Sequence, residues 1–508
     1  MILKENSFEI RDYQQSIAET ASKSNTLVVL PTGIGKTLIA VIVAAKRLEK
    51  FPESKVLVMA PTRPLNAQHK KSFEKFTTID PEKIALVTGK ISPSEREKIY
   101  NDAIVVVATP QTIKNDIESG KINLKDFSFA VFDEAHRSVK DYAYTQVAKR
   151  YNERSEHPLI LGLTASPGGS AEKISEIRNS LFIEEIEIRT ETEEDVKKYV
   201  KETVKDWVYV EFPEEFQMIK GLIENVLKED LYWLKEHHFT AFYHPSKTQL
   251  LMLQKRIGAQ YSKTKNFALV WALIRSAQAI KLEHAIELLE TQGVNSLNEY
   301  FWKIAASKKN TDRRMMKDRR VQEIVQRVKN LAESGVEHPK MHMLKALAKD
   351  LIAENPEIKI IVFANFRATV ERIKNMLQKE GIKTEVLIGQ AMKEGRGMSQ
   401  QQQIETLKRF GEGEFNVLVG SSISEEGLDV PAVNYAIFYE AVPSEIRAIQ
   451  RRGRVGRQIS GKIVFLLTKG TRDEAYFHSA LHKERKMHRI LEDMKNGIKK
   501  KEKLKDWL

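Results

Sequence analysis

The chain has 508 residues, with 82 Lys and Arg against 69 Asp and Glu, and it contains no cysteine. This length exceeds what one hydrophobic core organises, so two to four domains are expected. The lack of cysteine excludes disulfides, thiolate zinc sites and cysteine nucleophiles. The formal net charge of +13 favours a polyanionic partner such as nucleic acid.

The N-terminal stretch MILKENSFEIRDYQQ lacks the apolar core of a signal peptide. No apolar run in the sequence approaches the ~20 residues that span a membrane. We therefore expect an intracellular, cytoplasmic protein without membrane contact, and the positive charge adds the expectation of association with the nucleoid.

The stretch TLVVLPTGIGKTLIA, residues 26–40, predicts a strand, a tight loop and a helix, an arrangement that holds phosphate groups. The predicted cradle comprises Pro31, Thr32, Gly33, Ile34, Gly35, Lys36 and Thr37. Its glycines turn backbone N–H groups toward an anion, Lys36 adds a positive charge, and the hydroxyl of Thr37 suits a magnesium ion. Leu30 stands where the general pattern has a glycine. Because the later residues carry most of the phosphate contact, a nucleotide loop is still predicted.

Short apolar segments rich in Val and Ile alternate with helical patterns from residue 26 to about 190, which predicts a parallel sheet covered on both faces. One segment, FSFAVFDEAHRS, ends in Asp133 and Glu134. At the carboxyl end of a strand beside a phosphate loop, one acid can hold magnesium and the next can orient water. An isolated Asp-Glu pair is better explained as a solvated turn, but the upstream loop favours a nucleotide site.

A second series of strands begins near residue 358 and predicts another α/β sheet without a phosphate loop. Between the two series the apolar residues recur at helical spacing, which predicts a helical insert. The expected fold is α/β, with two open parallel-sheet domains at 1–205 and 336–508 and an all-helical insert at 206–335.

The later part of the insert, KIAASKKNTDRRMMKDRR, is densely basic. A solvated charged face is one interpretation, but duplex or junction contact is favoured. The residues expected to make that contact are Arg313, Arg314, Arg319 and Arg320.

Four insert aromatics, Tyr232, Trp233, Phe267 and Trp271, recur at helical spacing and are predicted to be core rather than base-stacking platforms. Near the C-terminus, HKERKMHRILED contains a Glu-Arg-Lys triplet but lies in a helical pattern, so a solvated helix is favoured over a nuclease site.

The order of short motifs resembles that of superfamily 2 helicases of the DEAH-box type. The motifs are APTRPLNAQ (60–68), TG (88–89), ATPQT (108–112), DEAH (133–136), LTASP (163–167), VFANFR (362–367), GSSISEEGLDVP (420–431) and QRRGRVGR (450–457). The long helical insert narrows the resemblance to the branch containing archaeal Hef, the Fanconi anaemia M helicase, Dicer and the RIG-I-like receptors, with archaeal Hef the most similar. This implies two RecA-like sheets that use ATP and Mg²⁺ for 3′ to 5′ translocation and remodelling of forked or branched DNA.

The resemblance also implies roles for residues that match the motifs. The implied catalytic residues are Lys36, Asp133, Glu134, Gln450, Arg454 and Arg457, the two last as arginine fingers. Arg11 and Gln14 would contact adenine, Gly427 and Asp429 the nucleotide sugar, and Thr37 and Asp133 the magnesium ion. The implied contacts to the nucleic-acid backbone are Arg63, Gly89, Thr109 and Ser421.

Two other functions stay open. One is an RNA-directed ATPase of the Dicer and RIG-I type, which the motor motifs do not distinguish from a DNA enzyme. The other is a catalytically inactive nucleic-acid scaffold, against which the intact Lys36 and Glu134 argue. We expect a monomer, and a C-terminal nuclease module, which Hef-like proteins often carry, would begin where this sequence ends.

Overall fold

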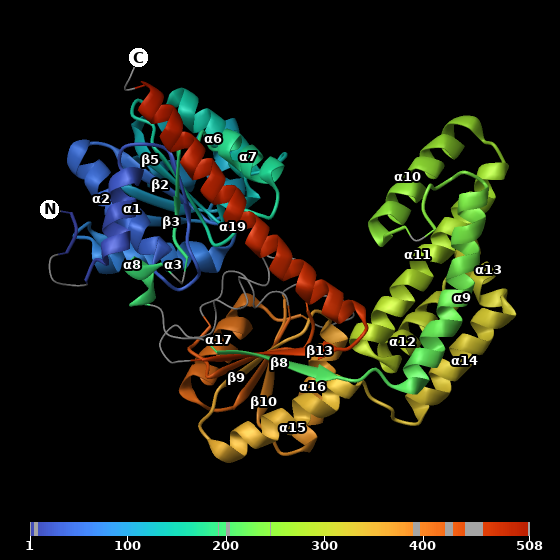
Figure 1. The fold of residues 1–508 in the computed structure, drawn as a ribbon. Helices are drawn as coiled ribbons and strands as arrows, with labels where there is room; N and C mark the ends of the chain where they lie inside the picture. The colour runs from blue at the N-terminus through green and yellow to red at the C-terminus, as the bar shows by residue number, and fades with distance from the viewer. Residues whose placement is uncertain are drawn as a thin grey trace.

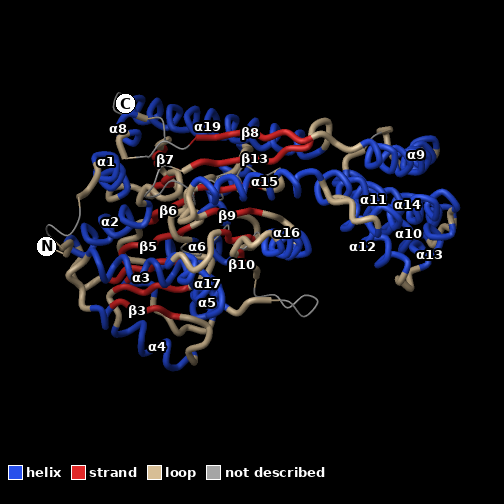
Figure 2. The backbone as a smooth tube through the Cα atoms, turned by 90° about the horizontal axis from the view of Figure 1, so that it is seen from below, coloured by secondary structure: helices blue, strands red, loops and turns tan. Residues whose placement is uncertain are grey.

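Two parallel sheets and a helical bundle make up the computed structural model (Figure 1). It describes residues 2–4, 9–190, 193–199, 204–243, 245–389, 397–421, 430–441 and 461–505. In sequence the bundle lies between the first sheet and most of the second. In space it lies beside the second sheet and away from the first, as Figure 2 also shows, and its Glu299 lies 3.8 Å from Arg372 next to that sheet. The predicted α/β class, with two open parallel sheets and a helical insert, is confirmed. No helix in the described ranges is long and apolar enough to cross a membrane.

The first sheet has the strand order β3-β4-β2-β5-β6-β1-β7, and all its pairings are parallel. Its strands are β1 (Thr26–Val29), β2 (Lys55–Met59), β3 (Ile84–Val87), β4 (Val105–Ala108), β5 (Phe127–Asp133), β6 (Ile160–Thr164) and β7 (Glu185–Ile188). Both faces are buried. In β1, Leu27 and Val29 belong to one core cluster and Val28 to the other, which explains the unbroken apolar run in the sequence.

Helices cover both faces of this sheet. The first face carries α1 (Asp12–Ala21), α2 (Lys36–Lys50) and α3 (Arg63–Phe76), and the second carries α5 (Pro110–Glu118), α6 (Ala143–Arg154) and α7 (Ala171–Ser180). The remaining short elements are α4 (Pro93–Asp102), α8 (Glu194–Lys197), η1 (Pro81–Lys83), η2 (Leu124–Asp126) and η3 (Ala135–Arg137).

The insert packs its helices around one apolar core that includes Phe216, Ile223 and Phe301. Its helices are α9 (Glu214–Glu236), α10 (Lys247–Thr264), α11 (Ala268–Gln292), α12 (Val294–Ala305), α13 (Asn310–Lys317) and α14 (Arg319–Glu333).

The second sheet has the order β10-β11-β9-β12-β13-β8. Its elements are β8 (Val204–Val210), β9 (Ile360–Phe363), β10 (Thr384–Leu387), β11 (Val417–Gly420), β12 (Tyr435–Phe438), β13 (Lys462–Thr468), α15 (Pro339–Glu354), α16 (Arg367–Lys379) and α17 (Gln400–Glu412). The sequence interpretation ended the first domain at residue 205 and began the insert at 206, whereas these residues form β8. This edge strand pairs in parallel with β13, although the whole insert separates the two strands in sequence. Lys205 and Asp206 interrupt β8 near its start, so it lacks the full-length apolar run of a strand that is buried on both faces.

A long final helix, α19 (Arg472–Lys505), runs from the second sheet across to the first (Figure 1). At its start, Arg472 Nη2 pairs with Glu283 Oε2 of α11 at 2.6 Å. Further along, Met487 and Leu491 are fully buried in the core of the first sheet. The prediction of a helix here is correct, but the prediction of a solvated one is wrong, because this helix contacts all three parts of the molecule.

Candidate functional site

The predicted phosphate loop lies between β1 and the N-terminus of α2. Gly33 and Gly35 both have left-handed backbones, with φ of 86° and 90°, which side chains with a Cβ rarely adopt. The first N–H groups of α2 have no acceptor within the helix, and its dipole favours an anion there. The loop therefore has the geometry of an anion-binding turn.

Side chains of the loop also suit a phosphate ligand. Lys36 Nζ donates to the carbonyls of Leu30 at 3.0 Å and Pro31 at 3.1 Å, which holds its ammonium against the loop. The Thr32 hydroxyl is buried and has no hydrogen-bond partner among the described residues, so it is available to a ligand oxygen. These features fit a nucleotide phosphate.

Gln14 packs directly against the loop. Its Nε2 donates to the Ile34 carbonyl at 3.3 Å, and a Cβ added at Gly35 would lie 2.3 Å from that nitrogen. Its Oε1 accepts the Arg11 N–H at 3.1 Å. Each amide atom keeps one more hydrogen or lone pair, which is what an adenine edge requires. Arg11 lies beside it, 4.7 Å from the centre of the Tyr199 ring.

The acid pair lies where β5 ends. Asp133 is 7% exposed; its Oδ2 is 2.9 Å from His69 Nε2 and its Oδ1 accepts the Glu134 N–H at 2.9 Å. Because an ionised carboxylate only accepts hydrogen bonds, the His69 ring must carry its proton on Nε2. Glu134 has φ of 53°, a strained conformation that is concentrated at functional sites.

A chain of contacts joins the acid pair to the phosphate loop. His136 Nδ1 lies 3.2 Å from Glu134 Oε2 and 3.2 Å from the hydroxyl of Thr164, the last residue of β6. The Thr164 carbonyl in turn accepts the Leu30 N–H at 3.1 Å. Sequence reasoning did not identify His69, His136 or Thr164 as site residues, although His136 and Thr164 lie within the quoted motifs and His69 directly follows one.

The oxygen donors at this site suit Mg²⁺. Thr37, on the first turn of α2, and Asp133 supply a hydroxyl and a carboxylate, which are hard ligands. No group of three His, Asp or Glu side chains forms a closed metal cage within the described ranges. Mg²⁺ in nucleotide sites usually takes one or two protein oxygens and completes its shell from phosphates and water, so the donor set fits.

The first sheet separates two sets of site residues. The phosphate loop follows β1, and the acid pair and Thr164 lie at the ends of β5 and β6; these three strands are neighbours in the sheet. Arg63, Gly89 and Thr109 follow β2, β3 and β4, which are also neighbours. Because parallel strands end at one edge, the two sets lie side by side along that edge.

Ser421 follows β11 in the second sheet and is 4% exposed. Its contact to a nucleic-acid backbone stays a prediction. Gly427, Asp429, Gln450, Arg454 and Arg457 lie outside the described residues.

The four insert arginines are all exposed, on α13 and α14, but their surroundings differ. Arg320 pairs with Asp318 at 2.8 Å and with Glu229, and these contacts raise the pKa of its guanidinium. The Arg314 guanidinium lies 4.0 Å from the Trp271 ring centre. Arg313 and Arg319 have no ion pair to any described carboxylate, so these two are the more available to an anion.

The prediction that the insert aromatics form core is wrong for three of the four. Tyr232 is 57% exposed, Phe267 75% and Trp271 39%. Only Trp233 packs partly against the insert core. Tyr232 lies outside the buried stripe of α9, and Phe267 precedes the first residue of α11. Helix α11 is apolar on several sides, so helical spacing does not reveal which side of it is buried.

Comparison with known proteins agrees with this arrangement. Residues 11–174 match the DEAD/DEAH box helicase family, residues 215–335 the helical bundle of a putative ATP-dependent RNA helicase, and residues 340–458 the helicase conserved C-terminal domain. The three matches correspond to the first sheet, the insert and the second sheet.

Individual relatives narrow the family. A putative ATP-dependent RNA helicase of Methanocaldococcus jannaschii is 44% identical over 97% of this chain, which spans 62% of that protein. The ATP-dependent DNA helicase fml1 of Schizosaccharomyces pombe is 33% identical over 92% of this chain, which spans 58% of fml1. The crystal structure of the Pyrococcus furiosus Hef helicase domain is 43% identical, covers 94% of this chain and 100% of its own, and has a TM-score of 0.73. The chain therefore belongs to the Hef helicase-domain family of DEAD/DEAH box helicases.

Proposed function

We propose that this chain is the motor of an ATP-dependent DNA helicase that moves 3′ to 5′ along one strand and remodels forked or branched DNA. The observation that carries the proposal is the division of the first sheet. A nucleotide-type loop and acid pair follow β1 and β5, and the predicted backbone contacts follow the adjacent strands β2, β3 and β4. With ATP and a nucleic-acid strand bound at these positions, one sheet would hold the two ligands that a motor must couple.

ATP is the proposed substrate of the site formed by the phosphate loop and the acid pair. The loop N–H groups and Lys36 bind its phosphates, and the Gln14 amide meets the adenine edge. Glu134 accepts a proton from the attacking water and orients it, while His69 fixes the Asp133 carboxylate. Mg²⁺, held through Thr37 and Asp133, supplies neutralisation of phosphate charge when bound.

Motif residues between positions 427 and 457 complete this proposal. Gly427 and Asp429 would contact the sugar, and Gln450 would face the γ-phosphate. Arg454 and Arg457 would act as fingers, which can supply ~10³–10⁵ in rate by stabilising transition-state charge. The support for these five roles is the match of their motifs to the family.

The physical link between hydrolysis and movement includes α19. The hydroxyl of Ser166, which lies two residues after Thr164, donates a hydrogen bond to the Met487 sulfur of α19 at 3.0 Å. The first turn of α19 is fixed to the second sheet and the insert. Closure of the two sheets on a nucleotide would therefore move α19, because this helix is attached to both.

The proposed nucleic-acid track runs past Arg63, Gly89 and Thr109. Of these, Gly89 is exposed, and no heavy atom lies within 4 Å of where its Cβ would be. Such contacts fall on phosphate and sugar, so little base specificity is expected. The insert arginines, chiefly Arg313 and Arg319, would hold a duplex arm.

Two further points rest on the relatives. The chain spans 62% and 58% of the two curated relatives described above, so further modules, including a nuclease, belong to the proposal for the whole protein. The printed description of the M. jannaschii relative names RNA, whereas that of fml1 names DNA. RNA is thus the competing substrate, and the monomeric state remains part of the proposal.

ATPase assays with matched variants test the proposal. Lys36→Ala and Glu134→Gln should abolish ATP turnover and leave DNA affinity nearly unchanged, because both residues belong to the proposed nucleotide site and not to the nucleic-acid track. Lys50→Ala, at the far end of α2, and Glu53→Gln, exposed just after that helix, are the controls and should behave as wild type. Near wild-type turnover in Lys36→Ala would refute the nucleotide site.

Single-stranded DNA, fork, four-way junction and RNA should then be compared as activators of wild-type ATPase. Stronger stimulation by branched DNA than by RNA supports the proposal. Stimulation by RNA alone would favour the competing substrate.

A further inference from the structure

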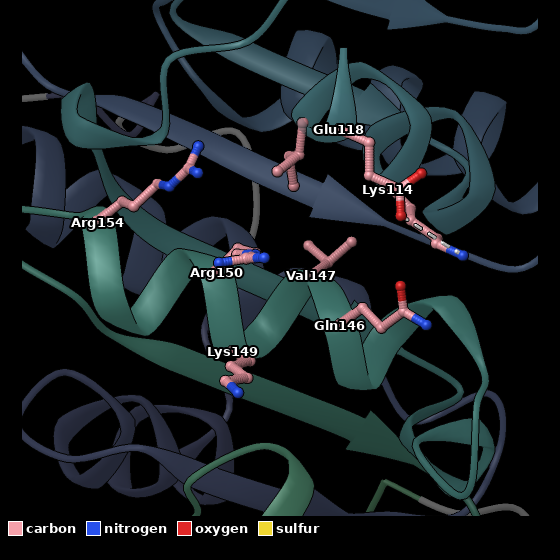
Figure 3. Close-up of a pocket in the computed structure, with 8 residues that line it drawn as sticks. Lys114, Glu118, Gln146, Val147, Lys149, Arg150 and Arg154 are labelled. Atoms are coloured by element: carbon pink, nitrogen blue, oxygen red, sulfur yellow. Dashed lines mark ion pairs between the residues drawn. The ribbon is translucent and has the colours of Figure 1, made fainter. Parts of the chain in front are cut away.

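A basic groove lies between α5 and α6 on the outer surface of the first sheet (Figure 3). Its volume is about 460 Å³. Four cations line it, Lys114 from α5 and Lys149, Arg150 and Arg154 from α6. None of the roles discussed above involves these residues.

The positive charge of the groove is poorly neutralised. Glu118 lies 3.7 Å from Lys114, and Glu153 lies 3.5 Å from Arg150, and both pairs are exposed to solvent. Exposed pairs of this length contribute little. Neither Lys149 nor Arg154 has a carboxylate partner in the part of the chain that the structure describes. A cleft of one charge sign raises the local concentration of counter-ions.

The placement of the cations on α6 also indicates an external anion. Arg150 and Arg154 are four residues apart and so share one side of the helix, where like charges repel. Both extend from α6 beside the groove in Figure 3. A guanidinium offers paired N–H donors that match two phosphate oxygens.

The floor of the groove is apolar, and the amide of Gln146 is the one side chain among its lining residues that offers both a donor and an acceptor. The floor consists of Ile117 and Val147, which are 6% and 0% exposed. Cations around an aliphatic floor select for charge, whereas a nucleobase needs an aromatic face or paired donors and acceptors. The chemistry thus fits a phosphodiester backbone.

The groove is continuous with the proposed track. Thr109 caps the N-terminus of α5, and its hydroxyl lies 2.9 Å from that of Thr112. Lys114 follows five residues later, about 7.5 Å along the helix axis. A strand passing Thr109 can therefore lie along α5 and reach the cations of α6.

We propose that the groove between α5 and α6 binds the phosphodiester backbone of the translocating strand beyond the segment held by Arg63, Gly89 and Thr109. This inference rests on the proposed function, since it needs a nucleic-acid strand in the track. It adds a second contact that only a longer strand can reach.

The test is the affinity of the full chain for single-stranded DNA of increasing length, measured by fluorescence anisotropy. The variant is Arg150→Ala with Arg154→Ala. The matched control is Lys71→Ala with Lys75→Ala, an exposed pair at the same spacing on α3, which covers the opposite face of the sheet. Arg150→Lys with Arg154→Lys keeps the charge and should retain most of the affinity.

We expect the double Ala variant to match wild type on an oligonucleotide that fills only the track and to bind longer ones more weakly. Two lost phosphate contacts, at about 0.7 each for single strands, reduce the salt slope by about 1.4. Wild type should then lose about sevenfold more affinity than the variant for a fourfold rise in salt.

Equal weakening at every length, loss only on duplex-bearing substrates, or no loss at all would overturn the groove proposal. A wild-type chain that binds no single-stranded DNA would instead refute the proposed function.

Discussion

Replacing His69 by Ala should weaken the use of Mg²⁺ without removing any group that touches the nucleotide. His69 is 1% exposed, and its Nε2 lies 2.9 Å from Asp133 Oδ2. Water has little access to replace this hydrogen bond. A hydrogen bond to a charged group contributes about 1.5–3 kcal/mol, and loss of such an outer-shell partner typically costs about 10–100-fold in metal affinity. The two ranges agree, since about 1.4 kcal/mol corresponds to a factor of ten.

The assay is ATP turnover as a function of Mg²⁺ concentration. The concentration for half-maximal rate should rise about 10–100-fold in His69→Ala, with partial recovery of the rate at high Mg²⁺. His69→Gln can still donate from an amide nitrogen, so its Mg²⁺ concentration for half-maximal rate should lie between those of wild type and His69→Ala. His482→Ala, exposed on α19, is the control. Unchanged Mg²⁺ dependence in His69→Ala would refute the role given to the His69–Asp133 contact.

Three further predictions concern stability and the insert. Lys340 and Asp473 form a fully buried ion pair, so either single substitution (Lys340→Met or Asp473→Leu) should cost about 3–5 kcal/mol and the double variant much less; hydrogen exchange in α15 and α19 checks this, and additive losses would contradict it. Burial raises the pKa of Asp230 from 3.8 to about 6, against the opposing effect of Arg275. The folded state favours its neutral form, so stability relative to Asp230→Asn should be greatest below pH 3.8 and fall by up to about 3 kcal/mol as pH rises through 6. Denaturant unfolding below pH 3.8 and above pH 6 measures this difference. A relative stability that increases with pH would contradict the prediction. Replacing Arg313 and Arg319 by Ala should weaken binding of fork and four-way DNA more than replacing the other two insert arginines, and an equal effect in an anisotropy titration would count against it.

The sequence was most informative where one segment contained the whole signal. The phosphate loop is local, because the left-handed backbones at Gly33 and Gly35 are a property of glycine. The strands of the first sheet were visible because burial on both faces requires unbroken apolar runs. The edge strand β8 lacks such a run, and its partner β13 lies on the far side of the insert.

Contacts between distant segments escaped sequence reasoning. Nothing local to His69 indicates that it faces Asp133, since the pairing depends on the neighbouring positions of β2 and β5. In the same way, the burial of Met487 depends on where α19 crosses the first sheet. The prediction for Trp271 was wrong for another reason, because α11 is apolar on several sides and its sequence does not reveal which side is packed.

The central claim is that ATP hydrolysis by this chain drives the remodelling of branched DNA. The most direct measurement is strand displacement from a labelled fork and a four-way junction, with wild type and Glu134→Gln compared at one salt concentration. We predict that wild type displaces strands only with ATP and Mg²⁺, and that Glu134→Gln binds both substrates but displaces neither. The account would be contradicted if wild type left both DNA substrates intact, or if Glu134→Gln displaced strands as fast as wild type.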